Sequence, residues 1–120
     1  MADRLVVKVT CGTDDQERAN QALTVASSAV AAGVEVSLWL TGEAAWFAVP
    51  GKAEEFSLPH ATPLADLLAI VLEGGSVTLC TQCAVRRGIT ESDALPGIRI
   101  AGAAVFVEAV LEIGTQALVY

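Results

Sequence analysis

The sequence has little positive charge, few aromatic residues and no long hydrophobic run. Seven Lys and Arg residues stand against 14 Asp and Glu residues, which gives a formal net charge of −7. Nucleic acids and anionic membrane surfaces attract proteins with an excess of Lys and Arg, so we expect neither as a partner. No apolar stretch reaches the roughly 18 residues of a transmembrane helix, and the first residues do not resemble a signal peptide.

Histidine is nearly absent: His60 is the only histidine of the sequence. No Ser-His-Asp set stands out. A zinc site of Cys11, Cys80, Cys83 and His60 can be imagined, but only Cys80 and Cys83 have ligand-like spacing, so we expect no metal and no cofactor. Three cysteines in a chain without an export signal indicate thiols in a reducing compartment, which predicts a cytoplasmic protein.

Strand-like and helix-like segments alternate along the chain. The expected strands are 5–10, 34–40, 76–79, 98–100 and 115–120. The expected helices are 16–32, 64–73, 81–87 and 103–112, with a helical turn at 41–48. Asp14 or Thr13 is the expected N-cap of the first helix. This order predicts a single domain, residues 1–120, of the α/β class: three layers around a mainly parallel five-stranded sheet.

Ligands of open parallel sheets gather at the carboxyl edge of the strands, near the point where the strand order reverses. We expect a flavodoxin-like order, in which the first and third strands are neighbours. The loops that carry Cys11, Trp46 and Cys80 would then converge on one mouth.

The segment 76–88 reads Ser-Val-Thr-Leu-Cys-Thr-Gln-Cys-Ala-Val-Arg-Arg-Gly. Its pattern puts Cys80 at the end of a strand and the start of a helix, where the helix dipole favours the thiolate over the thiol. Cys80 is therefore the predicted reactive thiol, and a buried packing role is the alternative. Cys83, one helical turn later, could resolve an oxidised or persulfidated Cys80, or could pack beneath the helix.

Cys11, Arg86 and Arg87 are candidate binding residues. Cys11 could face the same mouth as Cys80, although a Cys-Gly pair also suits a plain tight turn. Both arginines fall in the last turn of the cysteine helix, where they interact well with the helix dipole. About two turns, or roughly 10 Å, separate them from Cys80, so they are too far to activate it and could instead reach a partner.

Aromatic side chains offer a further candidate. Trp46 and Phe47 follow the second strand, where they could wall an apolar vestibule that excludes water. Packing in the core or anchoring a subunit contact is the alternative. Trp39 falls within a strand and is expected in the core.

The whole chain resembles the DsrE/DsrF-like (YchN-like) family of small sulfur-relay proteins. The length, the strand-helix-strand start with its Cys-Gly-Thr-Asp turn, and the strand-Cys-helix-Arg-Arg-Gly segment carry the resemblance. Sulfur-transfer subunits of the family have a cysteine with five residues between it and Arg-Arg-Gly, and here that spacing selects Cys80. Other members have Cys-x-x-Cys at this place, matched by Cys80 and Cys83. The run 38–47 resembles an actinobacterial-type branch.

This resemblance implies a flavodoxin-like fold, a homotrimer or homohexamer, and cytoplasmic transfer of a persulfide from a donor protein through Cys80 to an acceptor protein. The leading hypothesis is therefore a persulfide carrier, with sulfurtransferase activity left open. One alternative is a thiol-disulfide or peroxide-reducing enzyme that uses the Cys80–Cys83 pair. The other is a non-catalytic oligomeric binding module whose cysteines only pack.

Overall fold

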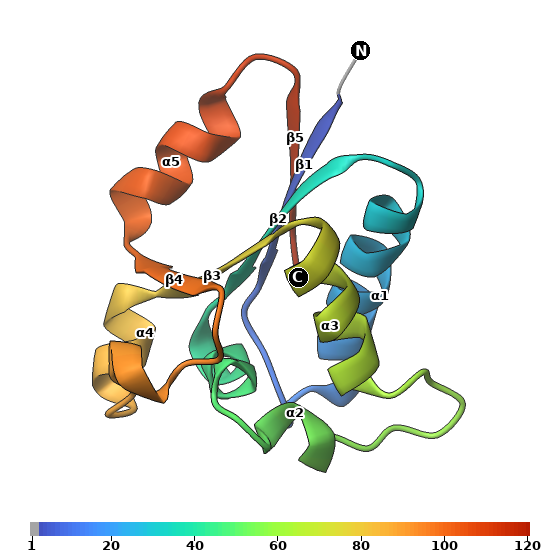
Figure 1. Ribbon diagram of the computed structural model, residues 1–120, viewed down its shortest axis with the longest axis vertical. Helices are drawn as coiled ribbons and strands as arrows, with labels where there is room; N and C mark the ends of the chain where they lie inside the picture. Colours follow the sequence, from blue (N-terminus) through green and yellow to red (C-terminus); the bar gives the residue numbers. More distant parts are fainter. Residues whose placement is uncertain (1–2) are drawn as a thin grey trace.

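The computed structural model describes residues 3–120 as five strands and their connecting helices (Figure 1). The strands are β1 (Arg4–Val9), β2 (Glu35–Leu40), β3 (Ser76–Cys80), β4 (Ile98–Ala101) and β5 (Thr115–Val119). The α-helices are α1 (Gln16–Ala31), α2 (Lys52–Glu55), α3 (Leu64–Gly74), α4 (Thr81–Arg86) and α5 (Ala103–Leu111), and two 3-10 helices are η1 (Gly42–Ala48) and η2 (Glu91–Asp93). The predicted strands and main helices are therefore confirmed, with ends that shift by one or two residues.

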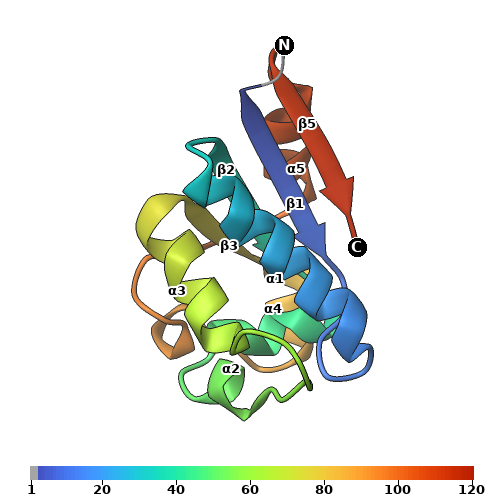
Figure 2. The ribbon, with the colours of Figure 1, turned by 90° about the vertical axis from the view of Figure 1, so that its right-hand side faces the viewer.

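All strand pairs of the sheet are parallel, in the order β4-β3-β2-β1-β5. The three-layer α/β class with a five-stranded parallel sheet is as predicted. The expected adjacency of the first and third strands is wrong, because β2 lies between β1 and β3. The order reverses instead between β1 and β5, which run side by side in Figure 2.

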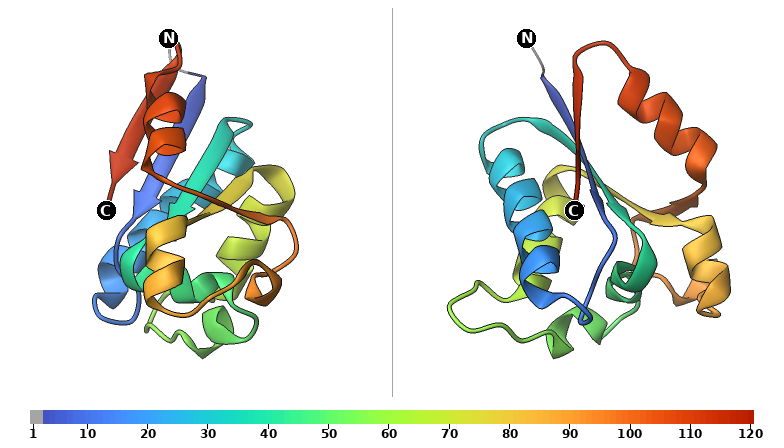
Figure 3. Two further views of the ribbon diagram at one scale, coloured as in Figure 1. Left: turned by 90° about the vertical axis from the view of Figure 1, so that its left-hand side faces the viewer. Right: turned by 180° about the vertical axis from the view of Figure 1, so that it is seen from behind.

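Helices α1 and α3 cover one face of the sheet, and α5 lies over the other (Figures 1 and 3). The face under α1 and α3 is apolar. Two rows of side chains cross four strands in register there: Val7, Leu38, Val77 and Ile98, then Val9, Leu40, Leu79 and Ile100. All but Ile100 are buried. This face holds the hydrophobic core, which is the main source of folding energy.

The opposite face of the sheet is polar. Lys8, Trp39, Thr78 and Arg99 stand in register across β1 to β4, one position along from the apolar rows. Cys80 follows Thr78 by two residues on β3, so its side chain shares this polar face. The helix above it packs loosely, since no residue of α5 is buried. A functional site therefore has space between the sheet and α5.

Local sequence features begin and end helix α1. Asp15, not the expected Asp14 or Thr13, is the N-cap, and its carboxylate accepts a hydrogen bond from the backbone N–H of Arg18 at 3.4 Å. The Asp14 carboxylate instead accepts from the N–H of Gly12 at 2.7 Å, which closes the turn after β1. At the other end Gly33 takes a φ of +84°, as expected for a residue that ends a helix.

Candidate functional site

Cys80 lies where its sequence context predicts, at the last position of β3 and the N-cap of α4. The apolar run Val77–Leu79 is buried as strand, and the chain then turns directly into helix without a connecting loop. Cys80 itself is only half-buried. The fold therefore presents the sulfur at the carboxyl edge of the sheet, open to a reagent.

The surroundings of Cys80 favour its thiolate. Burial raises the pKa of the thiol, but hydrogen bonds from the backbone and thiol of Cys83 and from the backbone of Gln82 lower it, as does the charge of Lys8. The lowering contributions prevail, and the pKa of Cys80 lies below that of an ordinary cysteine. Since the thiolate is the nucleophile in sulfur chemistry, this lowered pKa makes Cys80 the candidate nucleophile.

Alkylation of Cys80 by iodoacetamide should remain fast at pH values where an ordinary exposed cysteine has become slow. A lowered pKa keeps the thiolate populated until the pH falls through that lower value. The variant Lys8→Met removes one favourable charge, so the midpoint of its pH–rate profile should move to higher pH. The profile is measured by mass spectrometry of the alkylated peptide. A wild-type midpoint at or above that of free cysteine would contradict the assignment.

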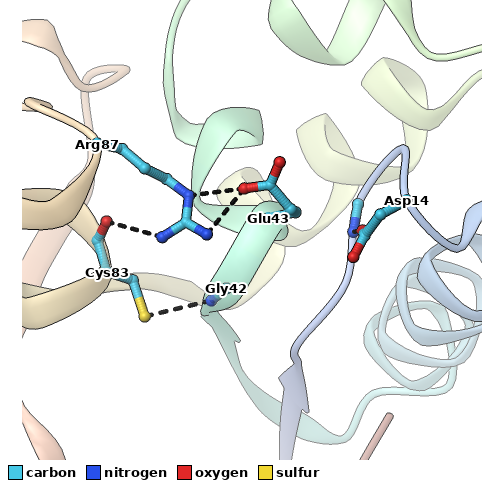
Figure 4. Close-up of polar contacts among 6 residues, drawn as sticks. Asp14, Gly42, Glu43, Cys83 and Arg87 are labelled. Atoms are coloured by element: carbon cyan, nitrogen blue, oxygen red, sulfur yellow. Dashed lines mark hydrogen bonds and ion pairs between the residues drawn. The ribbon is translucent and has the colours of Figure 1, made fainter.

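Cys83 ties α4 to the segment that follows β2. Its thiol is 8% exposed, and its Sγ accepts a hydrogen bond from the backbone N–H of Gly42 at 3.2 Å (Figure 4). Gly42 begins η1 and has a φ of +54°. Cys83 therefore packs under the helix, as one interpretation predicted. It also lowers the pKa of Cys80, and its role as a resolving thiol stays a prediction.

Arg87 strengthens the same junction between α4 and η1. Its Nε and Nη2 both lie 2.8 Å from Oε2 of Glu43, and its Nη1 donates to the backbone carbonyl of Cys83 at 3.2 Å (Figure 4). This geometry supports the interpretation that Arg87 interacts with the C-terminal end of the cysteine helix. Arg86 is exposed and stays a predicted contact for a partner. Arg87 thus acts as a positioning residue for the cysteine helix.

A cavity of about 500 Å³ opens beside Cys80, between the polar face of the sheet and α5. Trp39 and Phe106 form its apolar wall, with their rings edge to face at 5.3 Å between centroids. Lys8 stands next to them, its Nζ 4.9 Å from the centre of the Phe106 ring. The full lining is Lys8, Thr10, Trp39, Thr41, Gly42, Cys80, Thr81, Gln82, Cys83, Gly102, Ala103 and Phe106.

Cys11 and Trp46, which were expected at the same mouth as Cys80, lie outside this cavity, as do Arg86 and Arg87. Cys11 is 5% exposed and packs in the core, where burial, followed by the charges of Asp15 and Asp14, raises the pKa of its thiol. Trp46 lines a separate cavity, where Lys52 lies 5.9 Å from its ring centre. The chain after β1, β2 and β3 does meet at the Cys80 cavity, through Thr10, Thr41 and Gly42, but Cys11 packs in the core and Trp46 lines a separate cavity.

The apolar vestibule predicted for Trp46 and Phe47 is likewise corrected. Phe47 is 2% exposed and packs edge to face on Phe56 in the core. Trp39 and Phe106 provide the apolar wall of the Cys80 cavity instead. Trp39 is indeed buried, as expected, but its indole N–H has no hydrogen-bond partner among residues 3–120.

Lys8 is the functional residue that sequence reasoning missed. It interrupts the run Leu-Val-Val-Lys-Val, which the β-branched residues identify as a strand. A single lysine inside such a run is a signal that one face of the strand is not core. That signal could have assigned Lys8 to the face that later proves to carry Cys80.

Metal and membrane features were also sought in residues 3–120. Within this range no three His, Cys, Asp or Glu side chains lie close enough together to hold a metal ion. None of the helices described is both long and apolar enough to cross a bilayer.

The fold and the site define a class of protein: a small parallel α/β domain that presents an activated, partly exposed thiol at the carboxyl edge of its sheet. The chain matches the sequence model of the DsrE/DsrF-like family over residues 3–120. It belongs to that family, as the resemblance of its motifs predicted.

Relatives of the chain span bacteria and archaea. An uncharacterized protein of Methanocaldococcus jannaschii, MJ0760, is 30% identical over 105 residues; the match covers 87% of this chain but 38% of that protein. The structure of YchN from E. coli superposes with a TM-score of 0.81 at 18% identity and covers both chains completely. The structure of MTH1491 from Methanobacterium thermoautotrophicum, a protein of unknown function, superposes with a TM-score of 0.68 at 12% identity, and the match covers 98% of each chain. The two structural similarities support the fold alone.

Proposed function

We propose that this protein is a sulfur-relay protein that carries a persulfide on Cys80 and passes the outer sulfur to an acceptor thiol. Membership of the DsrE/DsrF-like family supports a role of this kind. One observation in the structure carries the assignment to Cys80: its sulfur lies at a ligand-sized cavity and its pKa is lowered by hydrogen bonds and a lysine charge. In each transfer, a thiolate attacks the outer sulfur of a persulfide, and the inner sulfur leaves as a thiolate.

Cys83 has a supporting part in this proposal. Its thiol and its backbone N–H both lower the pKa of the Cys80 thiol. These groups stabilise negative charge at Cys80 before attack and after sulfur has left. The Cys-x-x-Cys spacing of Cys80 and Cys83 favours a second candidate function, a thiol-disulfide or peroxide-reducing enzyme, because two thiols at this spacing can close a disulfide.

Intact-mass analysis after exposure to a persulfide donor separates the two candidates. The relay function predicts a gain of one sulfur atom, located by peptide mapping on Cys80. The redox function predicts the loss of two hydrogen atoms and a Cys80–Cys83 disulfide under mild oxidant. Sulfur that maps to Cys11 or to no cysteine would reject the relay assignment.

We also propose that the protein is a homo-oligomer in the cytoplasm, with three or six subunits as the family resemblance implies. Several large apolar side chains on or beside α5 and β5 are exposed: Val107, Leu111, Ile113, Leu118 and Val119. Ile113 is 99% exposed. In addition β5 pairs only with β1, so its outer edge is open. Apolar surface beside an open edge strand is usually covered by another chain.

Light scattering at micromolar concentration should give a mass of three or six chains for the wild type. The double variant Leu111→Glu and Ile113→Glu should shift the mass toward one chain, since it places charges in the proposed contact. The matched double variant Ile70→Glu and Val85→Glu changes exposed apolar residues elsewhere and should leave the mass unchanged. A monomeric wild type would contradict the assembly.

A further inference from the structure

The cavity beside Cys80 differs in charge from the rest of the molecule. The chain has 14 acidic and 7 basic residues, yet none of the residues that line this cavity is acidic. Lys8 is the one charged residue of the lining. None of the ion pairs formed within residues 3–120 involves it. Lys8 acts on the Cys80 thiolate and lies over the Phe106 ring, but no carboxylate lines the cavity, so this cation favours an anionic group on a ligand that approaches Cys80.

The size and chemistry of the cavity suit a small organic molecule. A volume of about 500 Å³ falls within the ~300–1,000 Å³ range of ligand pockets and exceeds what one transferred sulfur atom needs. Trp39 and Phe106 supply an apolar wall, and Thr81 and Gln82 add polar side chains at the exposed start of α4.

We propose that this cavity binds a low-molecular-weight thiol that carries a negative charge, so that sulfur enters or leaves Cys80 on a small molecule. The proposal rests on the proposed function, because the ligand is a substrate only if Cys80 carries sulfur. Lys8 pairs with the anionic group of the ligand, the aromatic wall contacts its carbon chain, and its sulfur meets Sγ of Cys80.

The transfer balances without any further reactant. The Cys80 thiolate attacks the outer sulfur of the small persulfide R–S–SH, one S–S bond forms, and the S–S bond of the donor breaks. The products are the Cys80 persulfide and the thiolate R–S⁻, so the charge is conserved and there is no net oxidation. In the reverse direction, a small anionic thiolate accepts the sulfur from Cys80. The ligand is thus either the donor or the acceptor, with the same recognition chemistry.

Rates of sulfur transfer test the charge preference. Glutathione persulfide is the probe whose organic group carries carboxylates, and the persulfide of 2-mercaptoethanol is the probe whose organic group is uncharged. Wild type should load faster from the probe with carboxylates, and Lys8→Met should reduce the ratio of the two rates by about fivefold, the size of a partly exposed ion pair. The ratio cancels any change in Cys80 ionisation, since both probes meet the same thiolate. The variant Lys8→Arg should restore the wild-type ratio of the two loading rates.

Two further measurements complete this test. Lys52→Met makes the same change of net charge at a distant aromatic contact and should leave the ratio unchanged. Unloading of persulfidated protein by glutathione, against unloading by 2-mercaptoethanol, then shows whether the small thiol also serves as acceptor. If the anionic group matters only for loading, the small thiol is the sulfur donor. If the anionic group matters only for unloading, the small thiol is the sulfur acceptor.

Binding without sulfur chemistry gives an independent readout. In the variant Trp46→Phe, Trp39 is the sole tryptophan, and it lines the cavity. S-methylglutathione, which cannot transfer sulfur, should change its fluorescence in a saturable way. The same compound with esterified carboxylates should not, and Lys8→Met should weaken the response.

Each outcome has one meaning. No saturable response, with equal loading from both probes, would overturn the small-ligand proposal and leave the persulfide function intact. Loading only from a persulfidated sulfurtransferase protein would overturn it in favour of a protein donor. Failure of every donor to load Cys80, with S-methylglutathione still bound, would instead reject the relay function while retaining the anion-binding cavity.

Discussion

Replacement of Cys80 by serine is expected to lower the rate of sulfur uptake by about 100-fold or more. A serine hydroxyl is not ionised at neutral pH, so the variant loses the attacking thiolate while keeping the size and position of the side chain. Neither remaining cysteine can substitute well, since both Cys11 and Cys83 are buried. Uptake is measured as the rate of mass increase with a persulfide donor in excess.

Two matched variants serve as controls for Cys80→Ser. Cys83→Ser removes the thiol contact but retains the backbone N–H groups, so it should slow uptake by about tenfold or less. Cys11→Ala lies in the core outside the cavity and should load at the wild-type rate. Equal loading of Cys80→Ser and wild type would remove the basis of the proposed function.

The second large effect is expected from Gly42→Ala, which should destabilise the fold by about 2 kcal/mol or more. Gly42 has a φ of +54°, and an alanine Cβ there would overlap the backbone carbonyl oxygen of Thr10. Left-handed strain alone costs about 1–2 kcal/mol, and the overlap adds to it. For a domain of this size the melting temperature should fall by roughly 10 °C.

Gly33→Ala is the control for the strain term. Its φ is +84°, but no atom lies within 4 Å of the position of a Cβ. Gly42→Ala should therefore cost clearly more than Gly33→Ala. It should also slow alkylation of Cys80, because the N–H of Gly42 donates to Cys83. Equal losses of stability in the two variants would show that the approach of Thr10 to Gly42 is not tight in solution.

Much of the fold was predictable because the signals are local. Alternating apolar strands and amphipathic helices define four βα units and a last strand, and Gly33 marks the end of α1 through its backbone freedom. The position of Cys80 at a strand end followed from the buried run Val77–Leu79 alone. Such features depend on a few neighbouring residues, so sequence patterns reveal them.

Strand order depends on contacts between distant segments and was not predictable in the same way. The strand patterns are the same whether β3 lies beside β1 or beside β2, so they could not give the strand order. They also did not show that Cys11 packs in the core while its neighbour Thr10 lines the Cys80 cavity. Phe106 reaches Trp39 only because α5 crosses back over the sheet. Trp46 and Phe47 follow β2 in sequence, but η1 turns them toward other neighbours.

The two-sided sheet has a consequence for how such proteins can diversify. The rows beneath α1 and α3 stabilise the fold, whereas Lys8, Thr81 and Gln82 beside the thiol lie outside the hydrophobic core. Exchanges at Lys8, Thr81 or Gln82 should therefore retune ligand preference at small cost in folding. The scaffold is suited to the design of new thiol chemistry, since the apolar face of the sheet and the residues around Cys80 can be varied separately.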